Sequence, residues 1–306
     1  MLVKILGSAA GGAFPQWNCA CDNCRALRAE TFRGKARTQT QVAISSDGRE
    51  WFLLGASPDL RAQIEATPEL HPRDGLRQSP IAGVVLLNAD IDHVLGLLLM
   101  RELQPLRVYA TASIRRILTD DNSMFAMLQR VQDQVKWTDF KVGENFQLLN
   151  AAAGEPNLRC RALSLGTHYP AYVSEQRRVR LDMTESSLCL IVESPGGKRL
   201  ACLAAVPQIS DALLADCDAA DLLLFDGTFW RDEELICIQG SGQTARQMGH
   251  VPVSESLIRL AQLRRPRKIY LHVNNTNPML NEAGPEYAQV RAAGWEIAED
   301  GWQFEL

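Results

Sequence analysis

The stretch IAGVVLLNADIDHVLGLLLM, Ile81 to Met100, sets a short polar loop between two apolar segments. Residues 81–87 are apolar or small without alternation, which predicts a strand buried on both faces. Residues 94–100 are apolar again, so Asn88–His93 is expected at a strand-to-helix junction. Two aspartates and one histidine in such a loop indicate a metal site.

Asp92 and His93 are neighbours, so a regular strand would point their side chains to opposite faces of the sheet. An irregular turn at the end of a strand lets both side chains face one ion. Asp90 has two interpretations, which the sequence leaves equally open. It is a metal ligand, or it caps the helix that follows and needs no metal.

The segments on either side predict two similar halves, each with strands followed by helices. QVAIS and REWFLLGA form a hairpin around Asp47-Gly48, and a helix is expected to start at Ser57-Pro58. In the second half, SSLCLIVES and RLACLAAV form another hairpin, and ISDALLADCDAA is a helix before the buried strand DLLLFDG. Ser113 is expected to cap a helix that is interrupted near Asp120–Asn122. Such halves predict an α/β fold of two packed sheets with helices outside.

Length and composition describe an ordinary globular protein. The 306 residues carry a formal net charge of −4, and no stretch is typical of a linker, so one domain spanning 1–306 is expected. Nothing in the composition favours nucleic acid as a partner. The N-terminus lacks the apolar core of a secretion signal, and no apolar run is long enough to span a bilayer. We therefore expect a soluble, cytoplasmic protein that does not insert into a membrane.

Eight cysteines in a chain of this length do not indicate a disulfide scaffold. Five of them are scattered and are interpreted as small core residues: Cys160, Cys189, Cys202, Cys217 and Cys237. Cys19, Cys21 and Cys24 have the spacing C-x-C-x2-C, which suits tetrahedral zinc with a fourth ligand from elsewhere. The alternative is three unrelated thiols or a redox pair.

Five histidines occur, and four of them lie beside Gly, Asn, Thr or Pro in loop-like or strand-end contexts. These are His93, His168, His250 and His272. His71 is typical of an ordinary surface loop. One such histidine is more often a structural residue than a ligand, but four of five in this setting favour a site.

Six segments together resemble a known family. GSAAGGAFPQWNCACDNC, ASPDLR, NADIDHVLGLL, FDGTFW, MGHVPVS and LHVNNTNP occur in this order between Gly7 and Pro278. As a set they resemble the pyrroloquinoline quinone (PQQ) biosynthesis protein B family, a branch of the metallo-β-lactamase fold. The resemblance implies a metallo-β-lactamase-like αβ/βα four-layer sandwich, with a cysteine-rich metal loop at 19–24 and a site at the strand ends.

The resemblance also implies which metal positions are kept. Active hydrolases of this fold carry His-x-His-x-Asp-His where this chain has Asn88 to His93. The two leading histidines, which bind the first metal, are replaced by Asn88 and Asp90. Asp92 and His93, which match the ligands of the second metal, are intact, and His272 matches that metal's final histidine.

Of the other ligands that the family pattern gives to the first metal, one is present and one is missing. His168 matches the remaining histidine of that site. The bridging aspartate is expected after the strand that ends at Val206, where this chain has Pro207 and Gln208. The resemblance therefore does not imply the two-metal water activation of the hydrolases.

One carboxylate and two imidazoles remain, and this set suits non-haem iron(II) and dioxygen, although zinc would also accept it. The family acts in a pathway that oxygenates the tyrosine ring of a cross-linked Glu–Tyr unit cut from a peptide. The resemblance thus implies iron- and O2-dependent hydroxylation of that small precursor, with iron held by Asp92, His93 and His272. Four residues are expected to orient ligands, bind substrate or handle protons: Asp90, His168, Asp226 and His250.

Two alternatives stay open. One is a carrier that binds the finished quinone or its precursor and helps it leave the cytoplasm, and the other is a zinc-dependent hydrolase. The sequence leaves the oligomeric state open and allows a homodimer.

For Cys19, Cys21 and Cys24 the resemblance supports structural zinc. Related phosphodiesterases supply a histidine as the fourth ligand at a position where this chain has Asn275. Either His272 serves the cysteine site or another group completes it.

Overall fold

The structure is a computed structural model that describes residues 1–306 except 74, 103, 121, 151–155 and 167–168. The chain divides into two compact units, each made of separate segments. The first unit comprises 1–6, 41–198 and 303–306, and the second comprises 7–40 and 199–302. The expectation of one domain over 1–306 stays a prediction.

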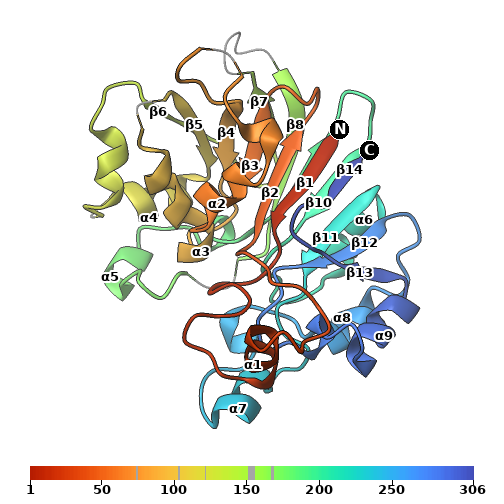
Figure 1. Cartoon of the computed structure of the whole chain (residues 1–306). Helices are drawn as coiled ribbons and strands as arrows, with labels where there is room; N and C mark the ends of the chain where they lie inside the picture. Colours follow the sequence, from red (N-terminus) through yellow and green to blue (C-terminus); the bar gives the residue numbers. More distant parts are fainter. Residues whose placement is uncertain (74, 103, 121, 151–155, 167–168) are drawn as a thin grey trace. The chain divides into compact units, whose positions relative to one another are not determined.

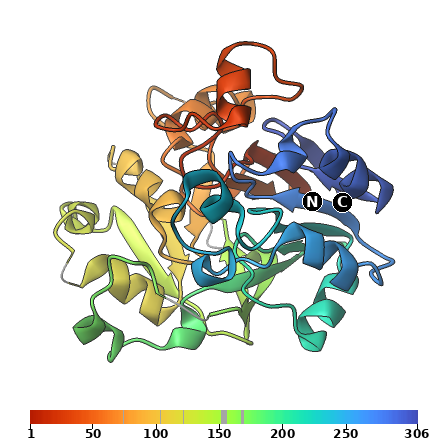
Figure 2. The same cartoon turned by 90° about the horizontal axis from the view of Figure 1, so that it is seen from below.

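The first unit contains a seven-stranded mixed sheet that brings the two ends of the chain together. The strand order is β14 (Gln303–Glu305), β1 (Leu2–Gly7), β2 (Gln41–Ser45), β3 (Trp51–Leu54), β4 (Ile81–Val85), β5 (Leu106–Ala110) and β6 (Val135–Asp139). β1 and β14 are antiparallel, and the Met1 ammonium donates to the Leu306 carbonyl at 2.9 Å. The termini accordingly lie side by side in both views (Figures 1 and 2).

β3, β4, β5 and β6 are parallel, and β4 is buried along its whole length, as its unalternating apolar sequence predicts. Parallel strands end at the same edge of a sheet, so the loops after β3, β4 and β5 share one edge. Three further strands of this unit pair antiparallel: β7 (Asn145–Leu149), β8 (Pro156–Ser164) and β9 (Leu188–Glu193).

Short helices follow the strands of the first unit, among them α2 (Leu60–Glu65), α3 (Ile91–Val94), α4 (Ala112–Thr119) and α5 (Glu175–Arg178) (Figure 1). The 3-10 turns are η1 (Pro68–Leu70), η2 (Leu95–Met100), η3 (Phe125–Gln129) and η4 (Met183–Glu185). α2 begins at Leu60, slightly later than the expected start at Ser57-Pro58, with Asp59 at its N-cap position.

Two local predictions can be compared directly with the structure. The hairpin around Asp47-Gly48 is confirmed, because β2 and β3 are antiparallel and Gly48 has φ +74°. Ser113 as the helix cap is wrong. Thr111 caps α4 by accepting a hydrogen bond from the Ile114 amide at 3.3 Å, and the Ser113 hydroxyl accepts from Asp182 N instead.

The second unit contains four parallel strands in the order β13 (Trp295–Ile297), β12 (Arg267–Leu271), β11 (Leu222–Asp226) and β10 (Arg199–Cys202). Its helices are α1 (Asp22–Arg28), α6 (Asp211–Asp218), α7 (Glu234–Gln239), α8 (Val253–Arg259) and α9 (Pro285–Ala292), with 3-10 turns η5 (Arg246–Met248) and η6 (Pro278–Leu280). Asp226 pairs in register with Leu271, so Asp226 and the following His272 reach the same edge of these strands.

Four of the five scattered cysteines are buried, as expected: Cys160, Cys189 and Cys202 lie in strands, and Cys217 lies in α6. Cys237 is the exception, because its place on α7 leaves it exposed to solvent. The interpretation of Cys237 as a core residue is therefore wrong. The apolar neighbours Ile236 and Ile238 give that helix an apolar sequence without burying the thiol.

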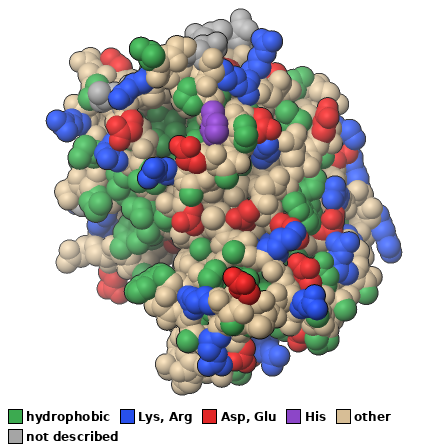
Figure 3. Space-filling view, in the orientation of Figure 1, with side chains coloured by type: hydrophobic (Ala, Val, Ile, Leu, Met, Phe, Trp, Pro, Cys, Tyr) green, Lys and Arg blue, Asp and Glu red, His purple; other side chains and the backbone are tan. Residues whose placement is uncertain are grey.

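Apolar side chains gather on the surface of the first unit, over the elements labelled α3, α4 and α5 in Figure 1 (Figure 3). The exposed large apolar residues of this unit include Ile91, Leu99, Met124, Met127, Val131, Val179 and Met183. Apolar patches of this kind are typical of binding surfaces. Among the described residues, no helix combines the length and apolarity needed to cross a bilayer.

Candidate metal centres

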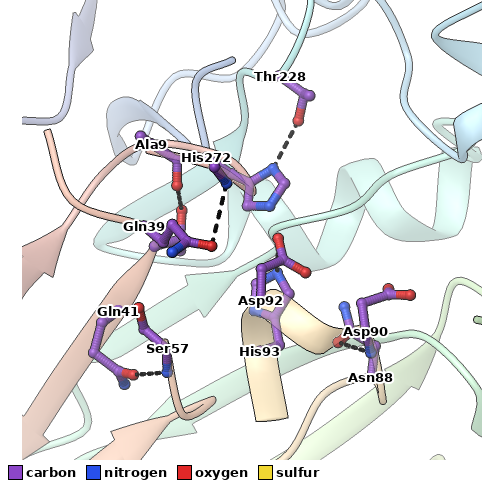
Figure 4. Close-up of polar contacts among 12 residues, drawn as sticks. Ala9, Gln39, Gln41, Ser57, Asn88, Asp90, Asp92, His93, Thr228 and His272 are labelled. Atoms are coloured by element: carbon purple, nitrogen blue, oxygen red, sulfur yellow. Dashed lines mark hydrogen bonds and ion pairs between the residues drawn. The ribbon is translucent and has the colours of Figure 1, made fainter. Parts of the chain in front are cut away.

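The polar loop after β4 leads into the four-residue helix α3, as expected. Asp90 occupies the N-cap position of α3, but its side chain makes no capping hydrogen bond. The Asn88 Oδ1 atom accepts from the Asp90 amide at 3.2 Å, and Asn88 also forms a β-bridge with Ser187 (Figure 4). The side chain of Asn88 thus stabilises the turn, where the hydrolases of this fold have a metal ligand.

Asp92 and His93 come close together within the first unit. Asp92 Oδ2 lies 3.7 Å from His93 Nε2, and His93 is buried. The backbone fixes this arrangement, because the His93 carbonyl accepts from the Ala56 amide at 2.6 Å. Gly55, next to His93, has φ +77°, a backbone conformation that favours glycine, and a Cβ there would make only an ordinary contact with the imidazole. Asp92 and His93 are thus adjacent residues of the short helix α3, and not part of the irregular turn that was expected, and they bring a carboxylate and an imidazole close together.

Tyr172 is a residue that sequence reasoning missed. Its hydroxyl donates to the Ala89 carbonyl in the same loop. Burial, and then the charge of Asp90, raise the pKa of Tyr172 well above its usual value. The phenol therefore stays protonated beside Asp90. Tyr172 follows its partner Ala89 by 83 residues and lies in no recognisable motif, so no local signal pointed to it.

In the second unit, four buried side chains form a hydrogen-bonded group, called here the buried polar cluster: Asp226, Thr228, His250 and His272. The two imidazole rings stack with centroids 5.5 Å apart and an interplanar angle of 22°. Asp226 Oδ2 lies 2.8 Å from His250 Nδ1. Thr228 Oγ1 lies 2.8 Å from His272 Nδ1 (Figure 4). Thr228 was not expected from the sequence.

Asp226 lies at the end of β11 and is 0% exposed. Burial alone would raise the pKa of its carboxyl, but the charge and hydrogen bond of His250 and the bond from Thr228 outweigh burial, so the pKa falls below its usual value. Its Oδ2 also accepts from the Val206 amide at 2.8 Å. Asp226 is therefore a fixed, ionised group that orients its neighbours.

His272 follows β12 and has φ +61°, an unusual value for a non-glycine residue. The next residue holds this conformation, because Val273 N donates to the Ser8 carbonyl and the Val273 carbonyl accepts from Ala10 N, both at 3.0 Å. His272 is 5% exposed. These two hydrogen bonds thus hold the loop that carries His272 against residues 8–10.

The thiols of Cys19, Cys21 and Cys24, called here the cysteine cluster, converge in the same unit, with sulfur atoms within 4.8 Å of one another. Burial raises the pKa of Cys21 to about 12. For Cys19, burial is outweighed by the bond from the Cys21 amide and by the neighbouring thiols, and the pKa is lowered. Three converging sulfurs fit the thiolate ligands of zinc, which binds the deprotonated form.

Asn275 lies over the cysteine cluster. Its Nδ2 atom is 3.1 Å from Cys19 Sγ, 3.6 Å from Cys21 Sγ and 3.3 Å from Cys24 Sγ. In a tetrahedron with usual zinc bond lengths, a fourth ligand atom lies about 3.6 Å from each sulfur. The amide nitrogen of Asn275 therefore stands near the fourth corner, and because an amide NH2 only donates, the amide must turn by 180° to bring Oδ1, a possible zinc ligand, to that corner. The ring of His272 is bonded to Thr228 instead.

The remaining expected positions are His168, Pro207 and Gln208. His168 lies outside the described residues. Gln208, in the place of the expected bridging aspartate, is exposed, and Pro207 has no side-chain donor.

Glu234 is a further residue that sequence reasoning missed. It is buried, and it accepts from Trp230 N at 2.6 Å and from the Thr276 hydroxyl. Burial raises the pKa of Glu234 to about 7.

The chain is similar to several known proteins. Residues 50–273 match the family described as the β-lactamase superfamily domain. The chain is 40% identical to coenzyme PQQ synthesis protein B of Methylorubrum populi, with 100% of each chain covered. It is similar to the crystal structure of Zn(2+)-bound PqqB from Methylobacterium extorquens, at a TM-score of 0.90, 40% identity and full coverage of both chains. A diphosphatase from the PhnP family, 17% identical, shares the fold with a TM-score of 0.67, covering 100% of this chain and 97% of that chain.

Proposed function

The chain belongs to the coenzyme PQQ synthesis protein B family of the β-lactamase superfamily, and from this premise we propose that it is an iron- and O2-dependent hydroxylase. The membership confirms the predicted α/β metallo-β-lactamase fold. A role in coenzyme PQQ synthesis follows from relatives that match over the full length. The substrate we propose is the tyrosine ring of the cross-linked Glu–Tyr precursor.

One observation carries the proposal: the positions of the first metal are used for other purposes. Asn88 binds the backbone of its own turn, and Gln208 is exposed. A two-metal hydrolase needs a second ion to activate water, and these positions do not supply its ligands. The proposed site therefore holds one ion.

We assign Asp92, His93 and His272 as the ligands of that ion, following the family pattern. Two imidazoles and one carboxylate fit iron(II), and bound iron would supply dioxygen activation. Asp92 and His93 present their groups on one side of α3, and Thr228 holds the His272 ring. Asp226, His250 and Asp90 would orient groups and hold protons, and His168 is assigned the same kind of role.

The surface beside Asp92 supports an aromatic substrate. Ile91, the neighbour of Asp92 in α3, is 56% exposed. Aromatic rings gain free energy by covering such a surface. The partner we expect is thus a small, peptide-derived molecule in the cytoplasm.

Structural zinc at the cysteine cluster is a second part of the proposal. Three convergent thiols and the nearby tip of Asn275 support it. A relative with bound zinc has also been solved. Zinc would join the N-terminal loop to the loop after β12 and so stabilise the fold.

The test is mass spectrometry of the Glu–Tyr precursor after incubation with iron(II)-loaded protein, O2 and a reductant such as ascorbate. We expect the precursor to gain oxygen with iron but not with zinc, and His272→Ala or His93→Ala to abolish iron binding and turnover. His71→Ala is the matched control, because His71 binds the Ile64 and Glu65 carbonyls outside the site.

A precursor that stays unchanged, although the protein holds iron and binds it, would refute the hydroxylase. Tight binding of the finished quinone without metal or O2 would then identify a carrier. An unchanged rate in His272→Ala would refute the ligand assignment.

A further inference from the structure

Thr228 lies two residues after the end of β11 and is 2% exposed. Its hydroxyl oxygen contacts three polar groups at hydrogen-bond distance. These are Asp226 Oδ1 at 2.6 Å, His272 Nδ1 at 2.8 Å and His250 Nδ1 at 3.1 Å. The backbone amide of Thr228 also donates to Asp226 Oδ1 at 3.0 Å, which fixes the threonine relative to the carboxylate. The contact with His272 is visible in Figure 4.

The three contacts determine the direction of each hydrogen bond. A hydroxyl offers one donor and two acceptor lone pairs, and an ionised carboxylate only accepts. The Thr228 hydroxyl must therefore donate to Asp226 and accept from the two imidazoles. Both Nδ1 atoms then carry a proton, and His250 Nδ1 can share its proton with Asp226 Oδ2 at 2.8 Å.

We infer that Thr228 sets the tautomer of His250 and His272, and that it is the positioning residue through which Asp226 orients the metal-binding histidine. With the proton on Nδ1, the basic lone pair of each ring lies on Nε2. In His272 this is the atom that would bind the metal, so the role in metal binding rests on the proposed function. The assignment of the tautomer does not.

The arrangement explains why a hydroxyl is needed between the carboxylate and His272. Metal-binding histidines usually donate their other N–H directly to a carboxylate or carbonyl. Here Asp226 Oδ2 is engaged by His250 and the Val206 amide, while Oδ1 is engaged by Thr228. The threonine extends the reach of one carboxylate to a second ring. Two stacked imidazoles are thereby held in the same tautomer by one buried charge.

The first experiment is NMR of the metal-free protein labelled with ¹⁵N-histidine. We expect His250 and His272 to show Nδ1–H shifts, each ring being assigned by its loss in a His250→Gln or His272→Gln protein. An Nε2–H tautomer of either ring in the unmodified protein would overturn the inference without any variant of Thr228.

The second experiment compares Thr228→Val with Thr228→Ser, which removes and keeps the hydroxyl respectively. Thr67→Val is the matched control, because the buried Thr67 hydroxyl donates to the Gln63 carbonyl at the end of α2, in the other unit of the chain. The probe is Co²⁺ titrated into protein whose cysteine cluster is loaded with zinc. We expect Thr228→Val to disturb the tautomer of His272 and weaken Co²⁺ binding about 10- to 100-fold, as for other partners of metal ligands. Thr228→Ser should stay within about threefold of the unmodified protein.

The outcomes separate this inference from the proposed function. Unchanged tautomers or unchanged Co²⁺ affinity in Thr228→Val would refute the positioning role, even if the iron protein hydroxylates the precursor. Conversely, the expected shifts with no hydroxylation by any iron-loaded protein would support the positioning role and refute the hydroxylase.

Discussion

The cysteine cluster and the buried polar cluster lie in the same unit, but the chain builds them in different ways. The three thiols come from six consecutive residues, and Cys19 and Cys21 are only partly buried. The buried polar cluster comes from three separate segments, and each of its members is less than 10% exposed. Its groups satisfy one another by hydrogen bonds, whereas thiols are weak hydrogen-bond partners.

This difference indicates different dependence on metal. Three thiols gain their strongest interactions from a bound ion, so metal at the cysteine cluster should contribute mainly to stability. The buried polar cluster is already ordered by Asp226, so its substitutions should act mainly on metal affinity and chemistry. The loop His272 to Asn277 joins the two, because it carries His272 at one end and Asn275 near the other.

The largest expected effect tests the cysteine cluster. Cys21→Ala should lose zinc and lower the free energy of unfolding by more than about 3 kcal/mol, because loss of a structural metal ranks among the most damaging changes. Urea unfolding together with metal analysis measures both. Cys237→Ala is the control: it removes an exposed thiol outside the cluster and should stay within about 0.5 kcal/mol. Full stability of a Cys21→Ala protein without zinc would contradict the structural role.

An intermediate effect on stability concerns Glu234, which accepts a hydrogen bond from Thr276 in the loop His272 to Asn277. Burial raises the pKa of Glu234 from 4.5 to about 7, so the folded chain keeps a proton that the unfolded chain loses above pH 4.5. Stability from this group is therefore greatest below pH 4.5 and falls as pH rises to about 7, by about 2–3 kcal/mol.

Glu234→Gln keeps an acceptor for the Trp230 amide and removes the ionisation. We expect its unfolding free energy to change less between pH 5 and pH 7.5 than that of the unmodified protein. Glu144→Gln, at an exposed position, should keep the original slope. The same slope in Glu234→Gln and the unmodified protein would show that Glu234 is not the group responsible.

The smallest expected effect is a change of zinc affinity at the cysteine cluster when Asn275, beside the fourth corner of the site, is replaced. An imidazole is a better zinc ligand than a carboxamide, so Asn275→His should raise zinc affinity about tenfold, or about 1.4 kcal/mol. Asn275→Ala is the matched control and should lower it. Competition with a chelator measures both. Equal affinity in all three proteins would place Asn275 outside the coordination sphere.

The elements that local sequence specifies were predictable. The unalternating run before Asn88 predicted a buried strand, and Asp47-Gly48 predicted a hairpin. These signals depend on neighbours in the chain, as does the spacing of Cys19, Cys21 and Cys24. Ser113 and Cys237 were misinterpreted because two polar residues compete for one helix end, and because an apolar sequence does not say which side of a helix is covered.

The candidate site was predictable only in part. The family resemblance supplied Asp92, His93 and His272, and the structure brings the first two within 3.7 Å of each other. Thr228, Tyr172 and Glu234 carried no signal, because these residue types are common and the partners His272, Ala89 and Thr276 lie 44, 83 and 42 residues away in the chain.

The sequence by itself thus determined the fold family, the thiol spacing and the loss of the first-metal histidines at Asn88 and Asp90. Tertiary structure decided which atoms meet: Asn275 with the three sulfurs, and Thr228 with Asp226, His250 and His272. The physical reason is range. Propensity and spacing act over a few residues. The register of the parallel strands β11 and β12, by contrast, pairs Asp226 with Leu271, in a strand that begins at Arg267, 41 residues after Asp226.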